Sequence, residues 1–116
     1  MLRELIFFRH YYNEFYLEQT QQVRDKIDFV LRLITVVQHI PEKYFKHIEG
    51  SDGLFEIRVQ QGNNIFRIFC CFDAGKVIVL LNGFQKKSQK TPKNEIELAE
   101  KLKKDYFNWK NLNNER

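Results

Sequence analysis

The sequence is poor in cysteine, proline and glycine, and it has no long apolar run. Two of its 116 residues are Cys, two are Pro and five are Gly. The two cysteines, Cys70 and Cys71, are neighbours that bridge poorly in an extended strand, and one pair is too few for a disulfide scaffold. No stretch approaches the roughly 20 apolar residues that a membrane helix needs, and charged residues near the N-terminus interrupt any signal-peptide core. We therefore expect a cytoplasmic protein with no membrane segment.

Ligands for a metal ion are also scarce. The three histidines, His10, His39 and His47, show no ligand spacing with the two cysteines. No metal and no other cofactor is expected.

What the sequence does contain is enough apolar material for one core. Hydrophobic residues make up 43% of the chain and aromatic residues 15%, which argues against global disorder. A chain of this length is about one domain. We expect a single domain over residues 1–116, with residues 111–116 as a frayed polar tail.

The order of expected elements defines a fold class. A strand is expected over residues 2–10, a short helix capped by Asn13 from there to residue 17 or 18, and a longer helix over residues 21–38 capped by Thr20. Residues 42–53 are expected to be a connection. Strands follow over residues 54–59, 64–73 and 76–84, and a last helix begins at Thr91 and Pro92. This β-α-α-β-β-β-α order predicts an α+β fold: a mostly antiparallel four-stranded sheet with all helices packed on one face.

The positive charge is concentrated in one part of the chain. The formal net charge is +4. Residues 58–93 hold seven basic residues and one acidic residue, a net +6, while the rest of the chain has twelve basic and fourteen acidic residues, a net −2. This hairpin region is therefore where an anionic partner is expected.

Strand alternation predicts which side chains share a face. If Gly62 and Asn63 form a two-residue loop, Arg58 lies directly opposite Arg67. If Ala74 and Gly75 form the next loop, Arg67 lies opposite Asn82. Two arginines facing each other repel by a few tenths to ~1 kcal/mol, so their pairing suggests a use for both. The alternative, that Glu56 neutralises Arg58 and the face is merely solvated, stays open.

The segment after the last strand extends this face. It combines an aromatic ring, amides and cations, a mixture that suits single-stranded nucleic acid because cations meet phosphates and flat rings stack on bases. The candidate RNA-binding residues are Phe84, Asn82, Gln85 and Lys93. A lysine-rich loop is by itself more often only a solvated loop.

The same residues carry a family resemblance. Segments 53–59 and 64–99 resemble the HigB-like, phage-derived branch of the RelE/ParE toxin superfamily. The shared pattern has a strand ending in E-h-R, a strand with h-Y/F-R-h, a strand ending in h-h-G-F, and a K-K-x-x-K-T-P loop before a helix. The matching residues are Glu56, Arg58, Arg67, Gly83, Phe84, Lys86, Lys87, Lys90, Thr91 and Pro92.

The resemblance implies the toxin of a type II toxin–antitoxin module. Such toxins are typically ribosome-dependent endoribonucleases that cut mRNA without a metal, by attack of a ribose 2′-OH on the adjacent phosphate. It implies Arg67 as the phosphate-stabilising catalytic residue, Arg58 as a second phosphate contact, and Lys86, Lys87 or Lys90 as a source of charge or protons. It also implies a cognate antitoxin, often a helix-turn-helix protein, and Phe84 as a base-stacking residue.

One position departs from the pattern, and two other functions remain open. Many relatives carry His just before the Gly-Phe pair, where this chain has Asn82, and Asn is no general acid or base at neutral pH. His10 and His47 are each expected to be structural, and Tyr106 is expected to belong to the core or to an antitoxin interface rather than to act as a catalyst. The alternatives are a non-enzymatic ParE-like inhibitor of DNA gyrase and a prophage nucleic-acid-binding accessory protein.

Overall fold

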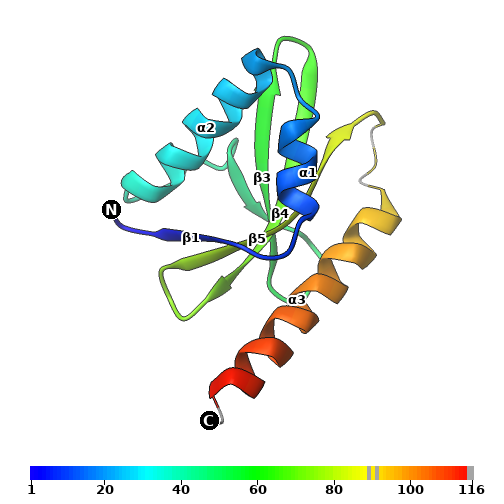
Figure 1. Cartoon of the computed structure of the whole chain (residues 1–116). Coiled ribbons are helices and arrows are strands. Elements are labelled where there is room, and N and C mark those ends of the chain that lie inside the picture. The colour runs from blue at the N-terminus through cyan, green and yellow to red at the C-terminus, as the bar shows by residue number, and fades with distance from the viewer. Residues whose placement is uncertain (89, 91, 115–116) are drawn as a thin grey trace.

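One mixed sheet organises the computed structural model, which describes residues 1–88, 90 and 92–114. The strand order is β1-β5-β4-β3-β2, with β1 parallel to β5 and the other neighbours antiparallel. The elements in chain order are β1 (Glu4–Phe7), α1 (Tyr11–Leu17), α2 (Gln21–Val36), β2 (Phe45–His47), β3 (Leu54–Gln61), β4 (Asn64–Asp73), β5 (Val77–Lys86) and α3 (Lys93–Asn114). The α+β class is confirmed (Figure 1). None of the helices described is long and apolar enough to cross a membrane.

The sheet has five strands, where the sequence predicts four. The additional strand, β2, lies in the segment expected to be a connection, and it pairs antiparallel with β3 through Phe45 opposite Ile57. It has only three residues. A run this short carries too little alternation to be recognised as a strand from its sequence.

The helices cover both faces of the sheet, so the prediction that they share one face is wrong. Helices α1 and α2 pack on one face with Ile57, Ile68 and Cys70. Helix α3 packs on the other face with Phe69 and Cys71, through Ala99, Leu102 and Tyr106. Figure 1 shows α3 on its own side of the sheet, running on to the C-terminus. The central strands carry apolar residues at successive positions, and such strands need cover on both faces.

The register of the first hairpin is confirmed and that of the second is wrong. Arg58 pairs with Arg67, as the two-residue loop predicts. In the second hairpin Asp73 pairs with Val77 and Arg67 with Phe84. Two features cause the difference: the connection has one residue more than expected, with Ala74 at φ 49°, and the β4–β5 register shifts between Phe69 and Cys70.

The register shift is a β-bulge that changes which residues face which helix. Cys70 pairs with Leu80 and Phe69 with Asn82, so Leu81 is the extra residue of β5. Leu80 therefore packs in the α1–α2 cluster, and Leu81 packs against α3. The additional loop residue and the bulge each move the side chains that follow on β5 to the opposite face of the sheet. The two changes cancel beyond the bulge, so Phe84 lies on the same face as Arg67.

The element ends differ from expectation at several points. Thr20 caps α2 as predicted, accepting a hydrogen bond from the Val23 backbone N–H at 3.3 Å. Strand β1 ends at Phe7, and α1 begins at Tyr11 with His10 rather than Asn13 at the N-cap position. Helix α3 begins one residue after Pro92, and Thr91 lies outside the described residues. The same helix continues to Asn114, so residues 111–114, expected as a frayed tail, are helical; residues 115–116 lie outside the description.

A buried polar cluster anchors the second half of α3 to the end of β4. Lys110 donates to both carboxylate oxygens of Asp73 at 2.7 and 2.8 Å, and the Tyr106 hydroxyl donates at 2.6 Å. Burial acts to raise the pKa of Asp73, but the bonds from Lys110 and Tyr106 and the Lys110 charge hold this pKa below 3.8. Burial and the bond to Asp73 raise the pKa of Tyr106 to about 12, so its hydroxyl remains a donor.

We predict that Asp73→Asn lowers the free energy of unfolding at pH 7 by about 1–3 kcal/mol, because a charge-assisted hydrogen-bond acceptor is lost. A depressed carboxylate pKa stabilises the fold above the unfolded-state pKa near 3.8, and this contribution is lost as the pH falls through the lower folded-state value. Urea unfolding at a series of pH values should show the two proteins converging in acid. Glu100→Gln, an exposed change on α3, is the control. Equal stability of wild type and Asp73→Asn at pH 7 would contradict the anchoring role of Asp73.

Candidate nucleic-acid interface

Four cations from four different segments meet on the face of the sheet that α3 partly covers. Arg58 and Arg67 lie directly opposite each other on β3 and β4. Lys46 on β2 lies opposite Glu56 on β3, and Lys86 on β5 lies opposite Ile65, two residues before Arg67. Side chains opposite each other, or two residues apart along a strand, share a face. We call Lys46, Arg58, Arg67, Lys86 and the carboxylate of Glu56 the basic face.

Arg67 is held at the centre of the basic face. Only 9% of the residue is exposed, and its Nη1 donates to Glu56 Oε2 in an ion pair. A buried charge of this kind is costly unless a partner neutralises it, and Glu56 supplies that neutralisation. The Nε of Arg67 is buried and has no hydrogen-bond partner among the described residues. Glu56 therefore fixes the guanidinium while leaving part of its donor capacity unused.

The neighbouring positive charges act on Lys86. Its pKa is lowered from 10.5, first by partial burial and next by the charge of Arg67, with a smaller contribution from Arg58. Glu56 acts in the opposite direction and raises it. The ammonium proton of Lys86 is therefore held less tightly than that of a free lysine.

A cavity of about 370 Å³ opens beside the two arginines. Its lining includes Glu56, Arg58 and Arg67 from the central strands, and Lys43 and Lys46 from β2 and the segment before it. With Glu42 as the other acidic residue, the lining holds four cations and two carboxylates. An anionic group of modest size, such as a phosphate, fits the charge of this site.

Two residues expected to touch RNA lie in the interior instead. Phe84 is 9% exposed and packs edge-on against Phe69 with ring centroids 5.1 Å apart, so its ring is part of the α3 core rather than a stacking platform. Asn82 is 2% exposed, and its Nδ2 donates to the backbone oxygen and the Oε1 of Glu95 at 3.2 and 3.1 Å. Asn82 thus ties β5 to the first turn of α3, and it presents almost no exposed surface to an RNA.

The other predicted contacts lie around the basic face without joining it. Gln85 and Lys87 are exposed on β5 and just after it, and alternation points them away from Lys86, toward α1. Lys90 and Lys93 are exposed, and Lys93 lies 4.0 Å from Glu97. The structure therefore brings Arg58, Arg67 and Lys86 together and leaves Lys87, Lys90 and Lys93 peripheral.

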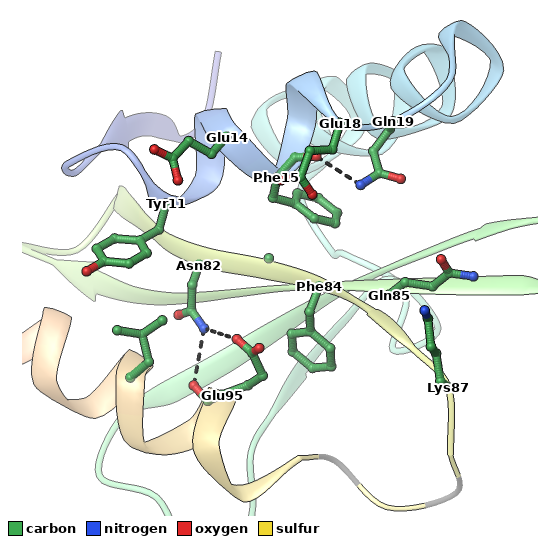
Figure 2. A pocket seen from close by; sticks show the side chains of 12 residues that line it. Tyr11, Glu14, Phe15, Glu18, Gln19, Asn82, Phe84, Gln85, Lys87 and Glu95 are labelled. Carbon is green, nitrogen blue, oxygen red and sulfur yellow. Dashed lines mark hydrogen bonds between the residues drawn. The ribbon is translucent and has the colours of Figure 1, made fainter.

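A second hollow lies at the edge of the sheet. It measures about 440 Å³ and is lined by the C-terminal half of β5, by α1 and by the first turns of α3. Figure 2 shows β5 crossing between α1 and α3, with Asn82 bonded to Glu95 on the α3 side. We call this hollow the edge groove; its lining residues are Tyr11, Glu14, Phe15, Glu18, Gln19, Asn82, Gly83, Phe84, Gln85, Lys87, Glu95 and Leu98.

The histidines lie outside the basic face. His10 stacks on Tyr11 and contacts Glu14 at 3.0 Å, and His47 packs edge-on against Phe55 on the opposite face of the sheet. Tyr106 is buried in the anchor with Asp73. Within the described part of the chain, no three His, Cys, Asp or Glu side chains gather closely enough to hold a metal ion.

Comparison with known proteins identifies the family. The model of the phage-derived Gp49-like proteins matches residues 14–104. The chain belongs to this family. It is a RelE-like toxin family, which confirms the assignment to the RelE/ParE superfamily without specifying the HigB branch. Among solved structures, the chain is similar to one in an archaeal RelE–RelB complex from Pyrococcus horikoshii, with 15% identity, a TM-score of 0.49, and 78% of this chain and 100% of the other covered. No curated protein matches the sequence significantly.

In this Gp49-like protein, sequence reasoning missed the contribution of β2. Lys43 and Lys46 line the cavity beside the arginines, but they lie in a segment expected to be a connection. Both lysines precede Arg58 and so lie outside the +6 region of residues 58–93. The sequence shows two lysines at these positions, but only the pairing of β2 with β3 places them beside the two arginines.

We predict that the pKa of Lys86 moves in opposite directions in two variants. Glu56→Gln removes a negative charge, so the pKa of Lys86 falls further; Arg67→Met removes a positive charge, so it rises. Side-chain NMR titration of the lysine Cε signals measures both shifts, with circular dichroism to confirm folding. Glu97→Gln, on the exposed surface of α3, should leave the value unchanged. Shifts of the same sign in both variants would show that the basic face is not electrostatically coupled as described.

Proposed function

We propose that this Gp49-like protein is the toxin of a type II toxin–antitoxin module and cleaves mRNA on the ribosome. The observation that carries the proposal is the basic face, where Arg58, Arg67 and Lys86 converge around one carboxylate. Membership of a RelE-like toxin family supports the toxin role. A ribosomal target places the activity in the cytoplasm.

The proposed reaction is a metal-independent phosphoryl transfer. The ribose 2′-OH gives its proton to solvent water and its oxygen forms a bond to the adjacent phosphorus, while the bond from phosphorus to the 5′-oxygen breaks and that oxygen takes up a proton from a donor on the protein. The products are a 2′,3′-cyclic phosphate and a 5′-hydroxyl. Such a reaction needs positive charge at the pentacovalent phosphate and a proton donor at the leaving group.

The residues of the basic face match these needs. Arg67 and Arg58 supply fixed positive charge and planar donors to the phosphate oxygens. Lys86 is our candidate proton donor to the 5′-oxygen, because it lies on the face of Arg67 and because burial, Arg67 and Arg58 lower its pKa. Glu56 is a positioning residue in this scheme, since it holds Arg67. This arrangement requires no histidine at position 82.

Peripheral cations have a different proposed role. Lys46 is the exposed member of the basic face on β2, and further exposed lysines lie around that face and in the loop beyond β5: Lys43, Lys87, Lys90 and Lys93. Exposed lysines contribute mainly sequence-independent attraction to nucleic-acid phosphates. We propose that they hold the ribosome-bound mRNA without taking part in the chemistry.

The proposed partner is a cognate antitoxin with a helix-turn-helix domain. Family membership supports an antitoxin, since RelE-like toxins are held inactive by one. A small gene beside this one that encodes such a protein would support the proposal. Co-expression of its product should restore growth to cells that produce this chain.

We predict that Arg67→Ala abolishes toxicity and mRNA cleavage while the protein stays folded. Removing a guanidinium that stabilises a phosphoryl-transfer transition state should cost at least about a hundredfold in rate. Primer extension on cellular mRNA after induced expression is the measurement. Lys76→Ala is the matched control, because Lys76 is an exposed cation of the same +6 region but lies at the far hairpin tip.

The outcomes separate the proposed function from its alternatives. Discrete cuts within translated codons in wild type and Lys76→Ala, and none in Arg67→Ala, agree with the proposal. Full cleavage by Arg67→Ala would show that the site is wrongly assigned. Growth arrest with intact mRNA and failing gyrase would indicate the ParE-like inhibitor, and unimpaired growth without an antitoxin would refute both toxin functions.

A further inference from the structure

Half of β5 has a neighbouring strand on one side only. Strand β1 pairs with Val77–Leu80, whereas β4 pairs with β5 along its whole length. Among the described strands, residues 81–86 of β5 therefore have no partner on the side away from β4. A strand edge of this kind presents every second backbone N–H and C=O outward and can accept another extended segment.

The chain leaves this edge open because β1 stops early. After Phe7 the backbone turns at Arg9, which has φ 58°, and enters α1. Helix α1 then lies against β5 so closely that a Cβ at Gly83 would approach the ring of Phe15 to 2.5 Å. On the other face, the bonds from Asn82 to Glu95 fix the first turn of α3. The two helices thus form the walls of the edge groove, and the open strand forms its floor (Figure 2).

The groove has the opposite charge to the basic face. Glu14 and Glu18 lie on the α1 wall and Glu95 on the α3 wall, against one cation, Lys87. In addition, Asn82 Oδ1 is buried and has no hydrogen-bond partner among the described residues. A buried acceptor without a donor is uncommon, because it has lost its hydrogen bonds to water without replacement. The groove therefore offers acceptors and negative charge where an occupant would supply donors and positive charge.

We propose that the edge groove binds an extended, basic segment of a partner protein, which adds to β5 as a further strand. The six open residues span about 20 Å at roughly 3.3 Å per residue, enough for a strand of typical length. Alternate side chains of the added strand would point to the α1 wall, where Lys or Arg meets Glu14 and Glu18. The intervening side chains would point to the α3 wall, toward Asn82 and Glu95.

Charge complementarity favours this occupant over RNA. Three carboxylates repel phosphates, whereas a protein strand is held by backbone hydrogen bonds that need no particular sequence. The groove and the basic face lie on different parts of the molecule, so this binding does not depend on ribonuclease activity. The two proposals can therefore fail separately.

The test is selection of random dodecapeptides displayed on phage against the full chain, followed by affinity measurement with the selected synthetic peptides. We expect enriched peptides to alternate β-forming residues with Lys or Arg. Glu14→Lys combined with Glu18→Lys should weaken their binding by at least about tenfold, because charge reversal replaces attraction with repulsion. Glu97→Lys combined with Glu100→Lys makes the same charge change on the exposed side of α3 and should leave binding unchanged.

Two further measurements locate the peptide and define its conformation. On binding, the backbone NMR signals of Gly83 and Gln85 should shift and their amide exchange should slow. Two sets of peptides are compared, one N-methylated at the odd residues and one at the even residues. Only one set should lose binding, because alternate backbone N–H groups of a strand point to opposite sides and only one side pairs with β5. Selected peptides without basic residues, binding unaffected by charge reversal at Glu14 and Glu18, or signal changes confined to the basic face would each overturn the proposal.

Discussion

The pairing of β4 with β5, with its bulge opposite Phe69 and Cys70, is the constraint on which both surfaces of this protein depend. One extra residue on β5 reverses the alternation for the rest of the strand. Because of it, Lys86 lies on the face of Arg67, and Gly83 lies under Phe15 of α1. Without the bulge the same sequence would direct Lys86 toward α1 and Gly83 toward α3. The basic face would lose Lys86, and the Phe15 ring of α1 would no longer lie over a residue without a side chain.

The bulge also explains how one strand serves two surfaces of opposite charge. Residues of β5 that face α3 connect the core to the basic face, and the open side of the same strand forms the floor of the acidic edge groove. Each surface contains a buried polar group whose hydrogen-bonding capacity is incomplete, Arg67 Nε in one and Asn82 Oδ1 in the other. Buried groups of this kind reduce stability and are found preferentially where a ligand completes them. The ion pair of Arg67 with Glu56 and the bonds of Asn82 to Glu95 offset part of that cost.

Much of the fold follows from local patterns, and the exceptions have identifiable physical causes. The α2 face and the register of Arg58 with Arg67 could be predicted because a helix period and a two-residue loop determine them. The bulge could not, since nothing in the run Val77–Leu81 distinguishes an extra residue from a regular one. The position of α3 could have been predicted: the consecutive apolar residues of β4 and β5 require cover on both faces, a signal that the expectation of a one-sided sheet overlooked.

The candidate site could be predicted in part. Arg58 and Arg67 follow from register alone, whereas the inward direction of Phe84 and Asn82 depends on where α3 packs. Lys43 and Lys46 depend on a strand too short to recognise. The family match and the resemblance read from the motifs agree on the superfamily, but the roles of individual residues are proposals that rest on the geometry of the basic face.

The central claim is that Arg58, Arg67 and Lys86 form the RNA-phosphate site and that the edge groove does not. NMR titration of the full chain with a non-cleavable 2′-O-methyl single-stranded oligoribonucleotide tests it most directly. We predict that the side-chain Nε–H signals of Arg58 and Arg67 and the Cε signal of Lys86 shift together, and that affinity falls steeply with salt. Signal changes at Gly83 and α1 with none at Arg67 would contradict the account.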